Sequence, residues 1–522
     1  MYVLITLSLP VLAIAIMVAL RFFQRPASYS WLTGTLGALL TWVSILLWQF
    51  DLPRRVVPSL WEPAGLFAAS PEFLAEPYAW LYALSLAALA AAVLLTFPAR
   101  AFGAVNPSIW TASLALSLLG ILAVLADNPL TLVLVWTAID LVEFLNTLRT
   151  ADSPSISERT VLAFSIRATG TGLALWASVF NATSGQAFLF ENSSGQASIM
   201  LLLAVGLRLG VLPLHLTYRT EPASRRGFGT IMRFVSAATS LVLLSRLPAS
   251  GLDPVLVPYL LILVSIAGLY SGWMWLSAPD ELSGRPYWII GMSSLSLAAA
   301  LRGNPTGSAA WGVALVLFGG ISFLYSARHT WYTRLLAGLG VLLMALPFSL
   351  TASGWSGNFP WPVLFWPLFI SAHFMLVAGY VRHLFRTGKA SFGELPTWAQ
   401  SAYPVGLALL GLTAILASVW GWPGALQTGA WLAAIASAVL GGLAGFAAWR
   451  FGWFIPENLS TPRVPGSSRL ADLLDLLARV FWALYRFVRQ FFDVASNLLE
   501  GDGGVLWTLL LLVLFIIILR SG

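Results

Sequence analysis

Four ionisable side chains lie inside long apolar stretches of the sequence. They are Asp140 and Glu143 in the stretch 129–149, Arg167 in 159–180, and Arg208 in 197–217. A guanidinium at the centre of a membrane-spanning helix costs about 2.5–3.5 kcal/mol on insertion scales, and it keeps its proton at ordinary pH. Arg208 therefore needs an acidic partner or a water-filled cavity. Ionisable groups at membrane depth are typical of ion and proton paths.

The four charges are predicted to lie in one layer. Counted from the cytoplasmic end of each span, Glu143 lies about 9 Å in, Arg167 about 12 Å, and Asp140 and Arg208 about 14 Å, at 1.5 Å per helical residue. Asp140 and Glu143 are three residues apart and share a helix face. Two carboxylates opposite two arginines form a neutral set. The pattern fits an ion or proton relay, or a salt-bridge staple that holds three helices together.

A proline follows Arg208 in its own helix. Within the segment 206–215, Pro213 removes a backbone hydrogen bond and predicts a helix break close to the buried charge. Helices broken at membrane depth are tolerated where they line a cavity, which is often an ion or substrate path. His215 and His373 are further candidates for a proton relay, although a lone histidine can equally be a hydrogen-bonded core residue.

The composition indicates an all-α, polytopic membrane protein. Hydrophobic residues make up 58% of the 522 residues and charged residues 9%, whereas soluble domains carry about 25% charged residues. The absence of cysteine excludes disulfides, thiolate catalysis and cysteine-ligated metals. The sequence contains no phosphate-binding glycine loop, metal-ligand cluster or nucleophile elbow. We therefore predict no catalytic residue, cofactor or metal site, and the net charge of +7 reflects membrane topology rather than nucleic-acid binding.

Apolar runs of about 20 residues, the length that crosses a bilayer, predict about 16 spans. The runs are 2–21, 31–50, 78–97, 107–126, 129–149, 159–180, 197–217, 229–247, 254–275, 286–302, 308–326, 332–351, 361–381, 401–420, 427–449 and 504–520. Between the last two, charged residues spaced three, four or seven apart from Arg469 to Asp493 predict an amphipathic helix on the cytoplasmic membrane surface. The sequence thus divides into N-terminal spans (1–60), a transmembrane core (61–455), an amphipathic helix with linkers (456–503) and a final helix (504–522).

The basic residues predict the orientation of the chain. Loops after odd-numbered spans hold 18 of them, with Arg233 and Arg285 among these, and the opposite side holds five. Positive charge favours the cytoplasmic side. Both termini are therefore predicted to be non-cytoplasmic, in the inner (plasma) membrane of a bacterium.

Four segments between Phe73 and Ser353 carry a family resemblance. They are 73–86 (FLAEPYAWLYALSL), 128–145 (NPLTLVLVWTAIDLVEFL), 206–215 around Arg208, and 345–354 (ALPFSLTASG) around Pro347. Together they resemble the antiporter-like membrane subunits of respiratory complex I (NADH:quinone oxidoreductase) and of multisubunit cation/proton antiporters. The resemblance implies a 14-helix core with two broken helices, in the lipid bilayer beside other membrane subunits. It also implies a role in moving protons or sodium ions, in a subunit with no redox centre of its own.

The sequence departs from the family at the relay positions. Thr137 stands at the family's glutamate position, although Asp140 or Glu143 could substitute one turn later. The family's lysine is replaced by Arg208, and arginine does not release its proton as a buried lysine can. No Asp, Glu, Lys or Arg occurs from Leu335 to Val381, where the second broken helix should contribute one. A complete relay of the family type is therefore not visible.

Three hypotheses follow. The first is an ion-translocating subunit with a reduced path through Asp140, Glu143 and Arg208. The second is a structural subunit of the same fold that keeps its buried charges as a staple. The third is a membrane glycosyl transferase that uses acidic residues of the outer loop, for which the candidates are Asp51, Glu62 and Glu72.

Overall fold

The computed structural model describes residues 2–57, 71–100, 107–148, 154–182, 189–216, 226–248, 254–356, 365–386, 390–427, 429 and 432–440. The chain divides into two units, Met1–Phe454 and Ile455–Gly522, and all described residues belong to the first. The predicted amphipathic helix and final span lie outside the described residues. The division of the sequence into four parts remains a prediction.

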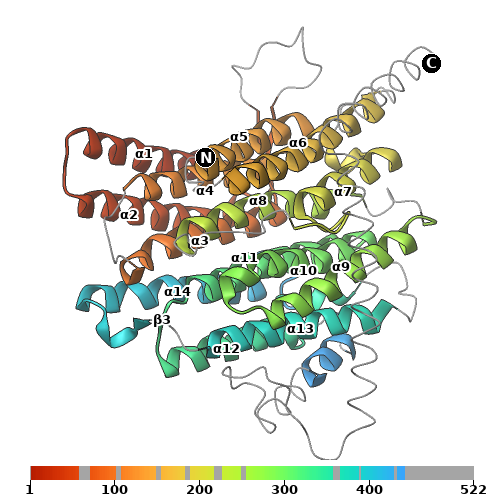
Figure 1. Ribbon diagram of the computed structural model, residues 1–522. Coiled ribbons are helices and arrows are strands. Elements are labelled where there is room, and N and C mark those ends of the chain that lie inside the picture. The colour runs from red at the N-terminus through yellow and green to blue at the C-terminus, as the bar shows by residue number, and fades with distance from the viewer. Residues whose placement is uncertain are drawn as a thin grey trace, which may run out of the picture. The chain divides into compact units, whose positions relative to one another are not determined.

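Fourteen long helices make up most of the described chain (Figure 1). They are α1 (Tyr2–Phe22), α2 (Ala27–Leu46), α3 (Pro77–Leu95), α4 (Ser108–Leu125), α5 (Pro129–Leu148), α6 (Pro154–Ala182), α7 (Gly195–Leu209), α8 (Arg226–Arg246), α9 (Val257–Ser277), α10 (Glu281–Leu301), α11 (Pro305–Leu324), α12 (Thr330–Ala345), α13 (Phe365–Phe385) and α14 (Thr397–Val419). Short 3-10 helices are η1 (Leu47–Phe50), η2 (Phe97–Arg100), η3 (Phe190–Asn192), η6 (Ala352–Trp355) and η7 (Phe392–Glu394). The described strands are short: β1 (Arg54–Val56) pairs antiparallel with β2 (Phe73–Ala75), and β3 (Ala327–Arg328) pairs parallel with β4 (Ala390–Ser391).

These helices confirm the predicted all-α membrane bundle. Ten of them are long and apolar enough to cross a bilayer, and α7 and α12 are shorter apolar helices. The fourteen helices match the first fourteen predicted spans in order. Of the fifteenth predicted span, 427–449, the described segment 432–440 is helical.

Helix α10 begins before the apolar run that predicted it. The sequence predicted a start at 286, whereas α10 begins at Glu281 and contains Pro286. Asp280 caps the helix: its carboxylate accepts a hydrogen bond from the Ser283 amide at 2.8 Å, and the Ser283 hydroxyl is 3.3 Å from the Asp280 amide. This capping box satisfies amides of the first turn and extends the helix beyond the apolar run.

The core of the bundle is formed by α3, α8 and α11, which contact one another. Nearly all residues of these helices are buried. Helix α3 is apolar on every side, as expected of a helix surrounded by protein, whereas α8 carries serines, threonines and Arg233 into the interior. Figure 1 shows α9, α10 and α11 side by side, and α10 also packs on α8. The polar α8 therefore lies between the helices α4, α5 and α7 and the helices α10 and α11.

One end of α8 is fixed to the β1–β2 pair and to the turn between α4 and α5. Arg246 forms an ion pair with Glu76 at 2.5 Å and donates to the backbone carbonyl of Val124 at 2.8 Å. In the same turn, Asp127 pairs with Arg55 at 2.8 Å. Burial raises the pKa of Asp127, and Arg55 and Arg246 partly offset that rise. These contacts fix where α5 begins, and hence the depth of its carboxylates.

Candidate ion-translocation site

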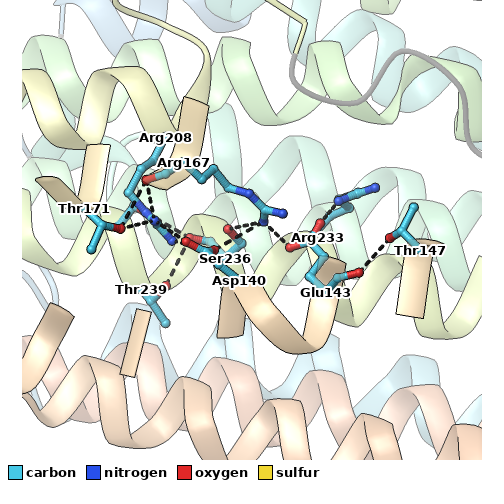
Figure 2. Close-up of polar contacts among 10 residues, drawn as sticks. Asp140, Glu143, Thr147, Arg167, Thr171, Arg208, Arg233, Ser236 and Thr239 are labelled. Carbon is cyan, nitrogen blue, oxygen red and sulfur yellow. Dashed lines mark hydrogen bonds and ion pairs between the residues drawn. The ribbon is translucent and has the colours of Figure 1, made fainter. Parts of the chain in front are cut away.

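Both carboxylates of α5 lie on its buried face. Asp140 and Glu143 are 2% and 1% exposed, beside the buried Trp136 and Ile139, while leucines on the opposite side of the helix are exposed. The three-residue spacing places the two acids on one side of the helix. Figure 2 shows both carboxylates turned toward guanidinium groups from neighbouring helices.

Arg208 of α7 binds Asp140 with two parallel hydrogen bonds. Its Nη1 donates to Asp140 Oδ2 at 2.7 Å and its Nη2 donates to Oδ1 at 3.0 Å (Figure 2). Nη1 also donates to the Thr171 hydroxyl at 3.0 Å, and the guanidinium carbon lies 4.2 Å from the centre of the Trp136 ring. Bidentate pairing is the strongest form of carboxylate recognition by arginine. The predicted acidic partner of Arg208 is thus present in the structure.

A glycine allows Arg208 to pass close to α6. A Cβ atom at Gly170 would lie 2.7 Å from Cγ of Arg208 and 3.1 Å from the backbone carbonyl oxygen of Ala204. The absence of a side chain at this position therefore lets α6 and α7 approach closely and directs the guanidinium toward α5.

Glu143 lies between two arginines. Its Oε2 pairs with Nη1 of Arg167 on α6, and its Oε1 pairs with Nη1 of Arg233 on α8. The same Arg167 nitrogen lies 3.5 Å from Asp140 Oδ1, so it links the two carboxylates. The five side chains form one continuous network across α5, α6, α7 and α8, called the charge network below.

The charge network corrects the predicted neutral set of two acids and two arginines. The count of loop arginines includes Arg233, although this residue lies inside the predicted span 229–247. The structure places it inside α8, where it is 6% exposed. Arg285, also assigned to a loop, lies buried in α10 and donates to the Thr230 hydroxyl at 2.9 Å.

Helix α7 ends one residue after Arg208. Gly210 adopts a left-handed conformation (φ 75°) and caps the helix, and its amide donates to Leu207 O at 3.2 Å. Such a conformation favours glycine because it has no Cβ. The predicted break near the buried charge is therefore present, but Gly210 produces it and Pro213 lies in the following turn. The charge network thus adjoins the end of helix α7.

A small cavity opens beside the charge network. Its volume is about 10 Å³, and Arg208, Arg233 and Ser236 line one side of it. Pro286, Ile289 and Ile290 of α10 line the other side. This space is about large enough for one water molecule, and its polar lining supplies groups to which a water could bind.

The second predicted break, near Pro347, is also present. Helix α12 ends at Ala345, and the Thr351 hydroxyl donates to the Met344 carbonyl at 2.7 Å. Asn304 donates from its side-chain nitrogen to the backbone carbonyl of Ser353 at 2.6 Å. This break is held by hydroxyl and amide groups.

The two histidine candidates lie outside the described contacts of the charge network. His215 follows the end of α7, and its Nδ1 lies 2.8 Å from the Pro213 carbonyl oxygen. His373 of α13 is buried near the second break, where its ring packs edge-on against Trp311 and Trp355 and its Nδ1 contacts the Ser437 hydroxyl. The relay role of both histidines remains a prediction.

The fold is similar to that of chains in three solved complexes. A chain in the structure of the Mrp complex from Dietzia sp. DQ12-45-1b matches 100% of this chain at 15% identity and a TM-score of 0.65, and this chain spans 63% of its length. The membrane-bound sulfane sulfur reductase, an archaeal respiratory membrane complex, gives 13% identity and a TM-score of 0.62, with 99% of this chain and 100% of the other covered. Respiratory complex I from Thermus thermophilus with bound NADH gives 19% identity and a TM-score of 0.60, with 85% and 100% covered.

No protein-family model matches the sequence, and no curated protein matches it. The structural matches nevertheless confirm the resemblance that the sequence showed. The apolar helices and the structural matches together identify the chain as an integral membrane protein with the fold shared by chains of the Mrp complex, the sulfane sulfur reductase and complex I.

Proposed function

We propose that this chain is a membrane subunit of a multisubunit assembly that moves protons, or sodium ions, across the membrane. The structural matches support this assignment, because the sulfane sulfur reductase is a respiratory membrane complex, and the other two matches are chains of the Mrp complex and of respiratory complex I. Its partners are then other membrane subunits. Any redox chemistry of the assembly belongs to those subunits, as expected from the sequence.

The observation that carries the proposal is the position of two buried carboxylates beside the end of a broken helix. Arginine keeps its proton, so the groups of the charge network that can exchange a proton are Asp140 and Glu143. A proton taken up by Asp140 would cancel its charge and weaken the bidentate pair with Arg208. The Arg167 guanidinium lies 3.5 Å from Asp140 and also contacts Glu143, so a change at one carboxylate alters the field at the other.

A structural role is the second candidate. The bidentate Arg208–Asp140 pair and the double pairing of Glu143 are also what a staple between four helices requires. In that case single removal of Arg208 destabilises the protein by about 3–5 kcal/mol, whereas simultaneous replacement of the whole charge network by neutral side chains of similar volume is tolerated. The three structural matches described above do not support the glycosyl transferase hypothesis. Glu72 of its predicted site lies 3.8 Å from Arg55, and Glu62 lies outside the described residues.

One experiment distinguishes the ion path from the structural role. Asp140→Asn combined with Glu143→Gln removes both proton carriers and keeps the side-chain volumes. In the purified assembly in proteoliposomes, the ion-path proposal predicts loss of proton or sodium flux while all subunits remain present. Glu72→Gln, which alters an ion pair at the outer loop, is the matched control and should keep its flux. Full flux from an intact assembly that carries the double variant would refute the ion path. An assembly that loses subunits, because Arg167, Arg208 and Arg233 no longer have carboxylate partners, would favour the staple.

A further inference from the structure

Helices α8 and α10 begin at the same end of the bundle, where an ion pair joins them. Arg226, the first residue of α8, donates from Nη2 to Oε1 of Glu281, the first residue of α10, at 2.5 Å. Arg226 also donates to the Phe323 carbonyl at 3.0 Å. The second carboxylate oxygen of Glu281 lies 3.8 Å from Arg328. Glu281 therefore lies between two arginines, as Glu143 does in the charge network.

The two carboxylates differ in their exposure. The Glu281 side chain is 7% exposed, and those of its partners Arg226 and Arg328 are 20% and 13% exposed, so this cluster reaches the surface. The side chains of Glu143 and its partner Arg167 are 1% and 2% exposed. One carboxylate thus lies at the end of the bundle and the other lies deep within it.

One face of α8 carries polar side chains from the first carboxylate to the second. Arg226, Thr230 and Arg233 follow one another at spacings of four and three, which places them on the same side of the helix. Arg285 of α10 donates to the Thr230 hydroxyl at 2.9 Å, and Arg233 pairs with Glu143 (Figure 2). At 1.5 Å per residue, Arg226 and Arg233 are about 10 Å apart along the helix. The α8–α10 interface is therefore polar at each of these turns.

The cavity beside the charge network lies in the same α8–α10 interface. Arg233 and Ser236 line it from α8, and Pro286, which directly follows Arg285, lines it from α10. The Ser236 hydroxyl lies 3.4 Å from Nη1 of Arg167 and so adjoins the charge network. A cavity of this size and lining has room for about one water molecule.

Helix α13 contributes further groups near Glu281. His383 interacts electrostatically with Glu281, and its Nε2 lies 3.0 Å from the Trp275 carbonyl oxygen. Because a carbonyl oxygen accepts hydrogen bonds, this nitrogen carries a proton. Arg382, next to His383, adds positive charge. These groups and the two arginines that pair with Glu281 favour a carboxylate that is ionised and ready to accept a proton.

We propose that Glu281 takes up protons from the aqueous phase and passes them along the α8–α10 interface to Glu143. Its carboxylate accepts a proton from hydronium and releases water. The protonated group then gives the proton to a water molecule in the interface, which passes it to the Glu143 carboxylate, and Glu281 becomes ionised again. A sodium ion would pass the arginines of the interface as a full charge and be repelled, whereas a proton bound to a carboxylate leaves a neutral group. This inference rests on the proposed function, for which it names the entry and the ion.

Replacement of the entry carboxylate tests the proposal in the full assembly in proteoliposomes. Glu281→Gln removes the proton carrier and keeps the side-chain volume. Proton flux should fall about 100-fold, as expected when a positioned proton-transfer group is lost. Lowering the pH by about two units raises the proton concentration about 100-fold and should restore most of this flux. Glu281→Asp keeps a carboxylate and should retain most of the flux at either pH.

The pH response separates this inference from the proposed function. The Asp140→Asn, Glu143→Gln protein should carry no proton flux at either pH, because its path lacks the deep carriers. If that protein loses its flux while Glu281→Gln keeps wild-type flux at both pH values, the entry through Glu281 is overturned and the proposed function stands.

The matched control is Asp280→Asn, which removes the neighbouring, exposed carboxylate. Asparagine caps a helix about as well as aspartate, so this variant should keep its flux, and a loss equal to that of Glu281→Gln would overturn the proposal. Arg226→Gln with Glu281→Gln removes both charges of the ion pair and leaves no unpaired partner. This variant decides the question if Glu281→Gln alone fails to assemble: it should lose flux to the same extent, and wild-type flux through it would contradict the proposal.

Discussion

Helices α7 and α12 both end inside apolar runs of the sequence, but different groups surround the two helix ends. Helix α7 ends beside Arg208, whose bidentate partner Asp140 belongs to a network of carboxylates and guanidiniums. Helix α12 ends among Thr351, Asn304 and backbone carbonyls, and its sequence region from 335 to 381 contains no charged residue. A broken helix therefore does not by itself define an ion path.

Under the proposed function, this difference predicts separate roles for the two helix ends. At the first break, groups that can gain and lose protons lie in contact with fixed positive charges. At the second break, Arg302 donates to the Ser356 carbonyl at 2.9 Å, and a guanidinium there keeps its proton. We therefore expect ion flux to depend on the groups at the end of α7, whereas the groups at the end of α12 mainly hold helices together.

The sharpest contrast comes from removing one arginine at each break. Arg208→Met leaves Asp140 buried without its bidentate partner and should destabilise the protein by about 3–5 kcal/mol. Arg302→Met removes hydrogen bonds to backbone carbonyls and should cost about 1–3 kcal/mol. Thermal unfolding of the purified assembly measures both. Equal losses of stability in the two variants would contradict the proposed difference between the two helix ends.

Adding a methyl group beside the charge network should destabilise the protein less than removing Arg208 does. Gly170→Ala places a methyl group against Arg208 Cγ and the Ala204 carbonyl, and overpacking of this kind costs about 1–3 kcal/mol. Gly172→Ala on the same helix meets nothing within 4 Å, so it should be neutral or slightly stabilising. A Gly170→Ala protein as stable and as active as Gly172→Ala would show that the close approach of α6 and α7 is not required.

A side chain at Gly210, at the end of α7, should destabilise the protein. Gly210→Ala forces an alanine into the left-handed conformation (φ 75°), at a cost of about 1–2 kcal/mol. Gly338→Ala in α12, where a Cβ meets nothing within 4 Å, is the control and should gain up to about 1 kcal/mol from helix propensity. Comparison of the two melting temperatures tests whether Gly210, rather than Pro213, ends the helix.

The smallest effect is expected at His373. Its ring packs against Trp311 and Trp355 near the second break, so His373→Gln should disturb packing and leave proton flux close to that of the wild type. Measurement of proton flux through the His373→Gln assembly in proteoliposomes tests this expectation. A loss as large as that of the Asp140/Glu143 double variant would place the second break on the path.

Much of the site was predictable because depth along a helix follows from residue count. Asp140, Glu143, Arg167 and Arg208 fell in one layer by the rise per residue alone, and the structure brings all four together. Arg233 was missed because the bias of arginine toward loops outweighed its position inside an apolar run. Arg233 lies four residues inside the predicted span 229–247, and this position could have placed it in the helix.

Other features depend on tertiary contacts that no local pattern contains. Gly170 is one of 44 glycines, and its role is evident only once α7 is packed against α6. Likewise, Asn304 reads as an ordinary helix cap, and its bond to Ser353 joins residues 49 apart in sequence. The ion pair of Arg226 with Glu281 also joins helices that are not consecutive in the chain.

The most direct test is infrared difference spectroscopy of the assembly in membranes while a proton gradient is imposed. The account predicts a protonated carboxylic acid band that appears with proton flux and is lost in the Asp140→Asn, Glu143→Gln protein. Continued flux with both carboxylates ionised throughout would contradict it.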